Sequence, residues 1–242
     1  YARNIGLSHA RGKWIIFADA DDFFTADCFT ILNEYMDSPH KVIYFNVRFV
    51  MSDNPSQESR RGTYYTNFFN DVNPENKLRY QSQVPWGKMI RRSFLSTFHI
   101  QFDETRIAND VYFSCLVGIY APKVTTDRRI IYYCPESGQS LAMSKQDRES
   151  LIIRFNASMK CNRLLRQEKI HYYLSPLPWC IPSAKTKEWL PAKYFFEYLF
   201  FFRLQAFKEL YYAFSAILSH MNEPATKETD NQCKKKTTNL KE

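Results

Sequence analysis

The sequence predicts an α/β fold with a mainly parallel central sheet, followed by a helical C-terminal region. Three short stretches, at residues 14–18, 41–50 and 128–135, have the apolar, β-branched and aromatic composition of strands. Segments with helical spacing precede or follow them, at residues 2–11, after Thr25 and from Asp110 onward. This alternation of strands and helices is typical of a parallel sheet that is covered by helices.

In the first third of the chain, single residues indicate where elements begin and end. Gly12 suits the position that ends the helix at residues 2–11. Thr25 is expected to cap the helix after the first strand, with Asp27 in its first turn. Residues 51–80 are polar and rich in Asn, Ser and Arg, so we expect a long loop there.

Within the α/β part, residues 84–95, "VPWGKMIRRSFL", are expected to form a turn at the start and a helix at the end. After the last predicted strand, the composition of the sequence changes. Residues 147–165 have helical spacing, residues 174–191 are rich in proline, and residues 193–218 have an aromatic face opposite a polar one. We therefore expect an α/β domain, a helical region and a disordered tail, at residues 1–145, 146–221 and 222–242.

The chain is basic, with a formal net charge of +8 over 242 residues. Such a surface suits a nucleotide diphosphate, an acidic lipid headgroup or nucleic acid, although a surplus of solvated Lys and Arg also explains it. No motif for nucleic-acid binding accompanies the charge, so nucleic acid is not expected as a partner. The aromatic helix at residues 193–218 has two interpretations. It packs on the domain or a partner subunit, or it lies in the plane of an anionic membrane surface.

The cysteines and the hydropathy indicate the compartment. Six cysteines stand singly, at positions 28, 115, 134, 161, 180 and 233, with no Cys-x-x-Cys pair. This usage favours reduced, mostly buried thiols and a cytoplasmic location. No stretch reaches the ~18–20 apolar residues that span a bilayer, so any membrane association is expected to be peripheral, at the inner face of the cell membrane.

An acidic cluster follows the first predicted strand. The stretch "WIIFADADD" ends in Asp19, Asp21 and Asp22, and in open α/β sheets ligands bind beyond the carboxyl ends of the strands. Three neighbouring carboxylates repel one another unless a cation offsets their charge. Mg²⁺ or Mn²⁺ does so with one or two carboxylates, water and the oxygens of a diphosphate. The alternative is a solvated acidic turn without a ligand.

Four segments in order resemble the family 2 glycosyltransferases, a large inverting group with the GT-A fold. Residues 2–24, "ARNIGLSHARGKWIIFADADDFF", resemble the family's Ala-Arg-Asn-x-Gly helix and the strand that ends in Asp-x-Asp. The segments "VPWGKMIRRSFL", "FDETRIANDVYFS" and "IIYYCPESGQSLAMS" resemble the Trp-x-Lys, Glu-Asp and closing segments of its bacterial members. The resemblance covers residues 1–145. It implies a Rossmann-like GT-A domain, of bacterial type, that is truncated at its N-terminus.

The resemblance implies roles for particular residues. Asp21 would bind the metal ion, with Asp19 beside it and nearer the ribose or sugar of the donor. Asp110 would be the catalytic base. Three further residues would lie near the donor: Arg3, Trp86 and Lys88.

One departure from the family pattern lies next to the predicted base. The usual Glu-Asp is Asn109-Asp110 in this chain, so the first carboxylate is replaced by an amide. Asn109, together with the additional acid Asp22, is expected to orient a substrate. Asp110 also suits the N-cap of the following helix, and this structural role is compatible with the catalytic one.

The resemblance implies a metal-dependent, inverting transferase of the hexosyltransferase type. It would move a sugar from a nucleotide-sugar, with UDP as the expected carrier, to a hydroxyl of a carbohydrate or lipid-linked acceptor. The pathway would be the synthesis of cell-surface polysaccharide or glycolipid. Members of the family have strands before the Ala-Arg-Asn helix that contribute to base recognition, so we expect the chain as given to be weakly active or inactive.

Two other interpretations stay open on the sequence alone. The first is a haloacid-dehalogenase-type phosphatase, whose opening motif also has two Asp separated by one residue. That motif needs Thr or Val two residues after its second Asp, where this chain has Phe23. The second is a degenerate transferase that acts as a binding or membrane-associated module.

Overall fold

The computed structural model describes residues 1–136, 147–180, 190–203 and 210–211, and at residues 60–64, 179 and 180 only the backbone. The chain divides into two compact units, Tyr1–Tyr194 and Phe195–Glu242. The first unit contains a mixed five-stranded sheet in the order β1-β4-β3-β5-β2. The strands are β1 (Trp14–Ile16), β2 (Phe23–Phe24), β3 (Val42–Met51), β4 (Lys88–Arg91) and β5 (Val124–Glu136).

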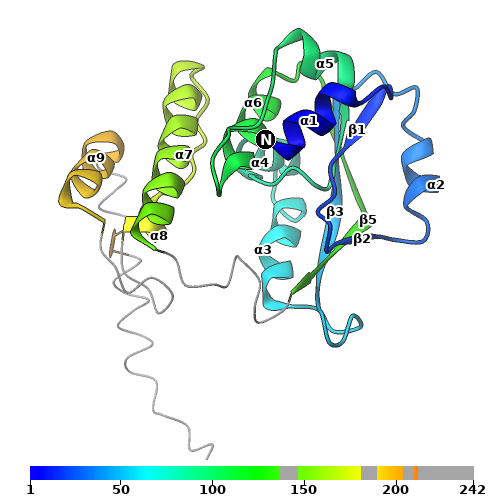
Figure 1. Ribbon diagram of the computed structural model, residues 1–242, viewed down its shortest axis with the longest axis horizontal. Coiled ribbons are helices and arrows are strands. Elements are labelled where there is room, and N and C mark those ends of the chain that lie inside the picture. Colours follow the sequence, from blue (N-terminus) through cyan, green and yellow to red (C-terminus); the bar gives the residue numbers. More distant parts are fainter. Residues whose placement is uncertain (137–146, 181–189, 204–209, 212–242) are drawn as a thin grey trace, which may run out of the picture. The chain divides into compact units, whose positions relative to one another are not determined.

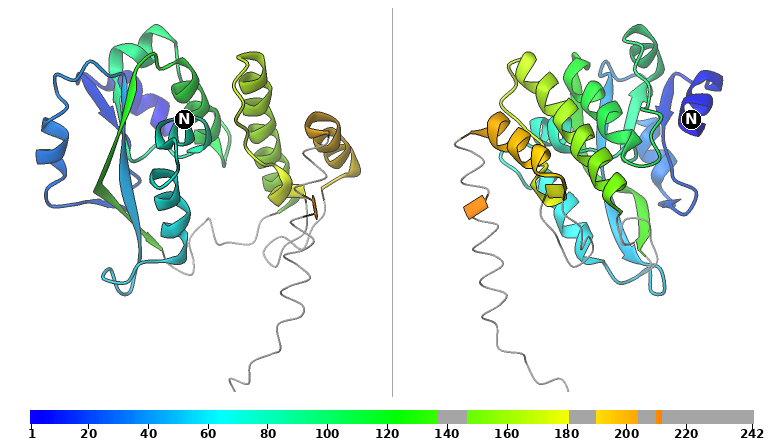
Figure 2. Two further views of the ribbon diagram at one scale, coloured as in Figure 1. Left: turned by 180° about the vertical axis from the view of Figure 1, so that it is seen from behind. Right: turned by 60° about the vertical axis from the view of Figure 1, so that its left-hand side comes forward.

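Helices cover both faces of this sheet (Figures 1 and 2). Helix α2 lies on one face, whereas α3, α4 and α6 lie on the other. The helices that precede β5 in the chain are α1 (Ala2–His9), α2 (Cys28–Asn33), α3 (Arg60–Phe69), α4 (Pro74–Gln81), α5 (Arg92–Thr97) and α6 (Asn109–Tyr120). The α/β class is therefore confirmed.

The sheet is more mixed than the sequence predicted. Its longest ladder, between β3 and β5, is parallel as expected, whereas the other three strand pairs are antiparallel. Two of these three involve β4, which the sequence analysis did not foresee as a strand. Its residues Met89 and Ile90 are buried between β1 and β3, and Gly87 precedes them with a φ of 65°. A four-residue strand directly before a helix is too short to show the alternation of apolar and polar residues by which strands are predicted.

Residues 51–80 form helices instead of the expected long loop. Helices α3 and α4 occupy most of this stretch, and the side chains of Tyr65, Phe68 and Leu78 are buried in the core. Asn73 caps α4, because its side chain accepts a hydrogen bond of 3.2 Å from the N–H of Asn76. The few apolar residues in a polar background were enough to fold the segment against the sheet.

Thr25 does not cap α2 as predicted. The helix begins at Cys28, and Asp27 occupies the N-cap position without a side-chain hydrogen bond to the helix. Thr25 instead continues the pairing of β2 with β5, since its N–H donates to the carbonyl oxygen of Ile131 at 3.0 Å. The helix predicted at residues 2–11 is confirmed as α1, which ends at His9.

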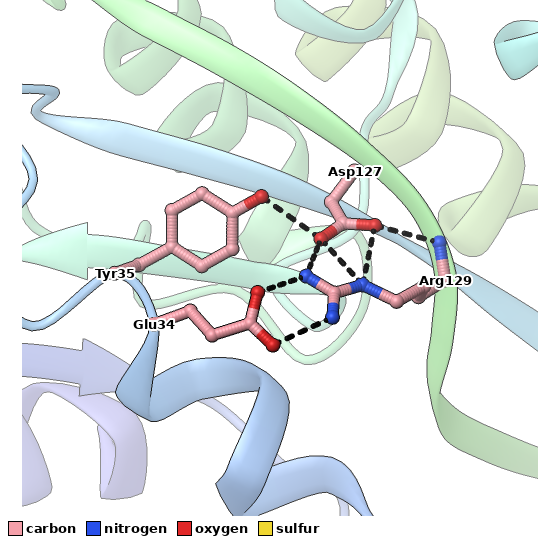
Figure 3. A network of polar contacts seen from close by, with 4 residues as sticks. All are labelled: Glu34, Tyr35, Asp127 and Arg129. Carbon is pink, nitrogen blue, oxygen red and sulfur yellow. Dashed lines mark hydrogen bonds and ion pairs between the residues drawn. The ribbon is translucent and has the colours of Figure 1, made fainter.

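A polar network ties α2 to β5 beside an irregularity in the β3–β5 ladder (Figure 3). The guanidinium group of Arg129 donates to both carboxylate oxygens of Glu34, at 2.8 and 2.6 Å, and to the buried carboxylate of Asp127. The hydroxyl of Tyr35 donates to the same Asp127 at 2.9 Å. Because Tyr35 and Arg129 both donate to the buried carboxylate of Asp127, and Arg129 also binds Glu34 of α2, the network fixes α2 on this end of the sheet.

The remaining helices follow the sheet along the chain. They are α7 (Arg148–Gln167), α8 (Leu177–Cys180) and α9 (Ala192–Phe202). Helix α7 packs on α6 through a small apolar cluster that includes Val111, Cys115, Cys161 and Leu165. The four cysteines whose side chains are described are buried thiols outside any disulfide, as predicted: Cys28, Cys115, Cys134 and Cys161. Among the described helices, none has the length and apolar character that a membrane span requires.

Some predictions lie outside the described residues. They concern the Ser-containing loop after β5, most of the aromatic helix beyond Arg203, and the tail at residues 222–242. The domain boundary near residue 145 stays a prediction.

Candidate active site

Arg3 joins two segments that are far apart in the sequence. Its guanidinium group donates to Oδ1 of Asp19 at 2.5 Å and to Oδ1 of Asn109 at 2.7 Å. Asp19 follows β1, and Asn109 is the first residue of α6. The structure therefore brings the Ala-Arg-Asn segment, the acidic cluster and the Asn-Asp pair into one site.

Asn4 holds α1 in the orientation that this contact needs. Its side-chain amide donates to the carbonyl oxygen of Phe102 at 2.9 Å, and its side-chain oxygen accepts from the N–H of Phe102 at 2.9 Å. The Arg3 guanidinium group also lies over the ring of Phe102, 5.5 Å from its centroid. Sequence reasoning did not single out Asn4, although it belongs to the same motif as Arg3.

Tyr132 organises the acidic turn after β1. Its hydroxyl oxygen accepts from the backbone N–H of Asp19 at 2.8 Å, and its O–H donates to the carboxylate of Asp22. The turn closes through the N–H of Asp22 and the carbonyl oxygen of Asp19, 3.2 Å apart. Sequence reasoning missed Tyr132, because its only visible signal was an aromatic residue in a strand.

The acids of the turn differ in their surroundings. The pKa of Asp22 is raised to about 6, mainly by burial and also by the charges of Asp19 and Asp21, whereas the hydrogen bond from Tyr132 opposes the shift. Asp21 is exposed, and Asp19 is ion-paired with Arg3. The turn thus offers one exposed carboxylate beside one that is half-buried.

Asp110 lies in the first turn of α6 and does not cap it. The N-cap is Ala108, which adopts a left-handed conformation with a φ of 52°, and no side chain caps the helix. The structure therefore contradicts the prediction that Asp110 caps the helix. Burial raises the pKa of Asp110, the positive charges of Arg3 and Lys88 lower it, and the charge of Asp19 raises it.

Trp86 and Lys88 lie beneath the site and are buried. The indole of Trp86 stacks on Tyr132, with ring centroids 6.1 Å apart, and contacts Phe49 and Tyr65. Lys88 lies on β4, and its side chain has 0% exposure. Burial leaves both residues a supporting role and argues against direct contact with a donor.

A divalent ion fits this turn only if a bound diphosphate and water supply part of its ligands. Within the described residues, no group of three or more His, Cys, Asp and Glu side chains is placed to hold a metal ion. Mg²⁺ and Mn²⁺ need no such cage, because they use one or two carboxylates together with phosphate oxygens and water. Asp21 would hold the ion, with Asp22 next to it, while the carboxylate of Asp19 is already paired with Arg3.

In open α/β domains, ligands bind in the crevice beyond the carboxyl ends of the strands, and the acidic turn after β1 lies at such an end. The fold and this turn therefore define a ligand-binding α/β domain. Comparison with known families indicates which kind of domain it is. Residues 1–98 match the family model "Glycosyl transferase family 2". Residues 1–98 are therefore similar to glycosyl transferase family 2, in agreement with the α/β fold that this part of the chain adopts.

Comparison with other proteins gives more distant matches. A search of curated proteins gave no match. Among solved structures, the chain is similar to S. aureus TarS 1-349 (18% identity, TM-score 0.45) and to its complex with UDP (18% identity, TM-score 0.48). Each match covers 73% of this chain and 46% of that one. A third structure, S. aureus TarS, is 17% identical with a TM-score of 0.45, over 84% of this chain and 31% of that one. The chain spans less than half the length of these structures.

Proposed function

We propose that the chain is the metal-dependent, inverting type of glycosyltransferase, which moves a sugar from a nucleotide-sugar to a hydroxyl group. The observation that carries this proposal is the bridge that Arg3 forms between Asp19 and Asn109. A transfer of this kind needs one group for the leaving diphosphate and another for the attacking hydroxyl within a single site. The acidic turn and Asp110 supply these two groups.

The proposed reaction breaks the bond between the anomeric carbon and the diphosphate oxygen, which leaves with the bonding electron pair. The acceptor hydroxyl attacks the same carbon from the opposite face, and Asp110 accepts its proton. Attack from that face inverts the anomeric centre. A divalent ion held by Asp21, when bound, would stabilise the negative charge on the leaving diphosphate.

The other polar groups of the site are proposed to position the substrates. Arg3 holds Asp19 and Asn109 in fixed orientations, and it adds positive charge next to the place where the diphosphate would lie. The side-chain oxygen of Asn109 accepts from Arg3, and its nitrogen donates one hydrogen to the carbonyl oxygen of Thr105 at 3.4 Å, so the second hydrogen can be donated to a substrate hydroxyl. Asp22, held by Tyr132, completes the acidic turn.

The substrate class is proposed from the resemblance of the motifs. A UDP-sugar is the expected donor, a hexosyl group the expected cargo, and a carbohydrate or lipid-linked hydroxyl the expected acceptor. These belong to the synthesis of cell-surface polysaccharide or glycolipid. Transferases of this kind work next to a membrane, which agrees with the basic charge of the chain.

A donor panel tests the proposed function. The protein is incubated with Mn²⁺ and each of a set of nucleotide-sugars, and the released nucleoside diphosphate is measured, with EDTA in a parallel series. We expect release from one donor or a few, stimulated by Mn²⁺. Release of inorganic phosphate from a phosphate ester, without release from any nucleotide-sugar, would instead support a phosphatase.

Helix α9 is proposed to rest on an anionic membrane surface. Phe196 and Phe200 lie one helical turn apart and are exposed, and the exposed Lys193 and Arg203 flank them. Aromatic side chains enter the headgroup boundary while basic ones meet acidic lipids. The double variant Phe196→Ser/Phe200→Ser should lose flotation with vesicles that contain phosphatidylserine, whereas Phe29→Ser, another exposed phenylalanine, should not. Equal flotation of all three proteins would contradict this.

A further inference from the structure

Lys88 is a fully buried lysine whose ammonium group has few partners. Its Nζ donates to the carbonyl oxygen of Ser82 at 3.0 Å and lies 5.6 Å from the centroid of the Tyr44 ring. It forms no ion pair with any residue that the structure describes. A buried cation without a direct counter-ion is costly, so its retention in the core of a folded domain calls for a reason.

The packing of α6 turns the face that carries Asp110 toward the segment that leads to this lysine. The hydroxyl of Ser114 donates to the carbonyl oxygen of Val84 at 3.0 Å, which anchors α6 on the segment that leads into β4. Asp110 precedes Ser114 by four residues and therefore lies on the same face of the helix. That face covers the segment to which Lys88 is bonded through Ser82.

The charges of Lys88 and Asp110 act on each other across this packed face. Burial lowers the pKa of Lys88 to about 7, while the carboxylate of Asp110 and the thiol of Cys115 oppose that shift. In the other direction, burial raises the pKa of Asp110, and Lys88 lowers it. Each group therefore favours the charged form of the other, which couples their charges.

Two other charged groups also act on Asp110, and the positive charge of Arg3 lowers its pKa more than that of Lys88 does. They are Arg3 from α1 and Asp19 from the turn after β1. Arg3 already donates to Asp19 and Asn109, so its positive charge is shared with a second carboxylate. The negative charge of Asp19 itself disfavours ionisation of Asp110. Of the two cations that face Asp110, Lys88 is thus the one that forms no ion pair with any acid that the structure describes.

We propose that Lys88 is a positioning residue: its buried ammonium group acts through space to keep the Asp110 carboxylate charged and ready to accept a proton. This inference rests on the proposed function only for the meaning of that charge, because the coupling itself is a property of the folded chain. It also replaces the expected contact of Lys88 with the donor by a role beneath the site.

The test follows the ionisation of Asp110 directly. The carboxyl carbon of Asp110, assigned by its absence in Asp110→Asn, is titrated by NMR in the wild-type protein, Lys88→Met and Lys88→Gln. Gln keeps a donor for Ser82 but has no charge, and Met removes both. We expect the midpoint of Asp110 to rise by roughly one pH unit in both variants, the size of a lost charge partner. The variant Lys160→Met, which removes an exposed lysine paired with Asp103, should leave it unchanged.

The outcomes separate charge from structure and coupling from function. A raised midpoint in Lys88→Met alone would assign the effect to the lost hydrogen bond and overturn the proposal, as would an unmoved midpoint in both variants. Thermal unfolding should show Lys88→Met at least as stable as wild type, because a buried amine is removed. If the midpoint rises but Asp110→Asn still releases nucleoside diphosphate normally, the proposed function fails while the coupling stands.

Discussion

A Gly118→Ala variant is expected to unfold at a much lower urea concentration than the wild-type protein. A Cβ atom at this position would lie 1.8 Å from the carbonyl oxygen of Arg79 and 2.7 Å from its carbonyl carbon. These are backbone atoms of α4, so the clash cannot be relieved by turning a side chain. Helices α4 and α6 would have to move apart, at a cost of more than about 3 kcal/mol in the free energy of unfolding.

The same movement would break further contacts between the two helices. Arg79 donates through Nε to the carbonyl oxygen of Gly118 at 2.9 Å and through Nη2 to that of Ala121 at 2.8 Å. Since α6 carries Asp110, a displaced α6 would also disturb the candidate site. The matched control is Gly6→Ala in α1, where a Cβ atom meets nothing within 4 Å. Alanine there should raise the stability by roughly 0.5–1 kcal/mol. Unfolding of Gly118→Ala at the wild-type urea concentration would show that the helices are not in this contact.

An Asp110→Asn variant is expected to lose at least about 100-fold in turnover, the lower end of the effect of a general base. The amide has nearly the size of the carboxylate but cannot accept the proton of the attacking hydroxyl. Stability at neutral pH should not fall, because a buried charge is replaced by a neutral group. Transfer is measured as nucleoside diphosphate released in the presence of an acceptor, and binding of UDP is measured separately.

The comparison for this variant is Asp103→Asn, in the loop before α6. Asp103 is ion-paired with Lys160 and has no assigned part in the reaction, so the variant should keep most of its turnover. Loss of UDP binding in Asp110→Asn would point to a role in holding the donor. Wild-type turnover in Asp110→Asn would remove Asp110 as the base.

The elements that the sequence predicted correctly are those whose signal is local. Strands β3 and β5 and helices α1 and α6 have continuous apolar runs or clear helical spacing. The short strand β4 could not be predicted in this way, because its pattern is set by two neighbouring strands that sandwich it. Helices α3 and α4 were missed since most of their residues are polar, and packing on the sheet outweighs their composition.

The site divides along the same line. Arg3, Asp19, Asn109 and Asp110 were predictable, because their residue types and order are those of recognisable motifs. Tyr132 was not, since its hydroxyl matters only through two partners more than a hundred residues away. The burial of Lys88, which the resemblance placed near the donor, could not be predicted, because lysine is almost never fully buried without a partner. Its burial is the structural fact that changed its assigned role.

The account depends most on the claim that the acidic turn and a diphosphate share a divalent ion through Asp21. Calorimetric titration with UDP, in Mn²⁺ and then in EDTA, tests it on the wild-type protein, Asp21→Ala and Asp37→Ala, whose exposed carboxylate is paired with Lys13. The account predicts Mn²⁺-dependent binding of UDP to wild type and Asp37→Ala, and loss of that dependence in Asp21→Ala. Binding of UDP to Asp21→Ala with the wild-type affinity and the same response to Mn²⁺ would contradict it.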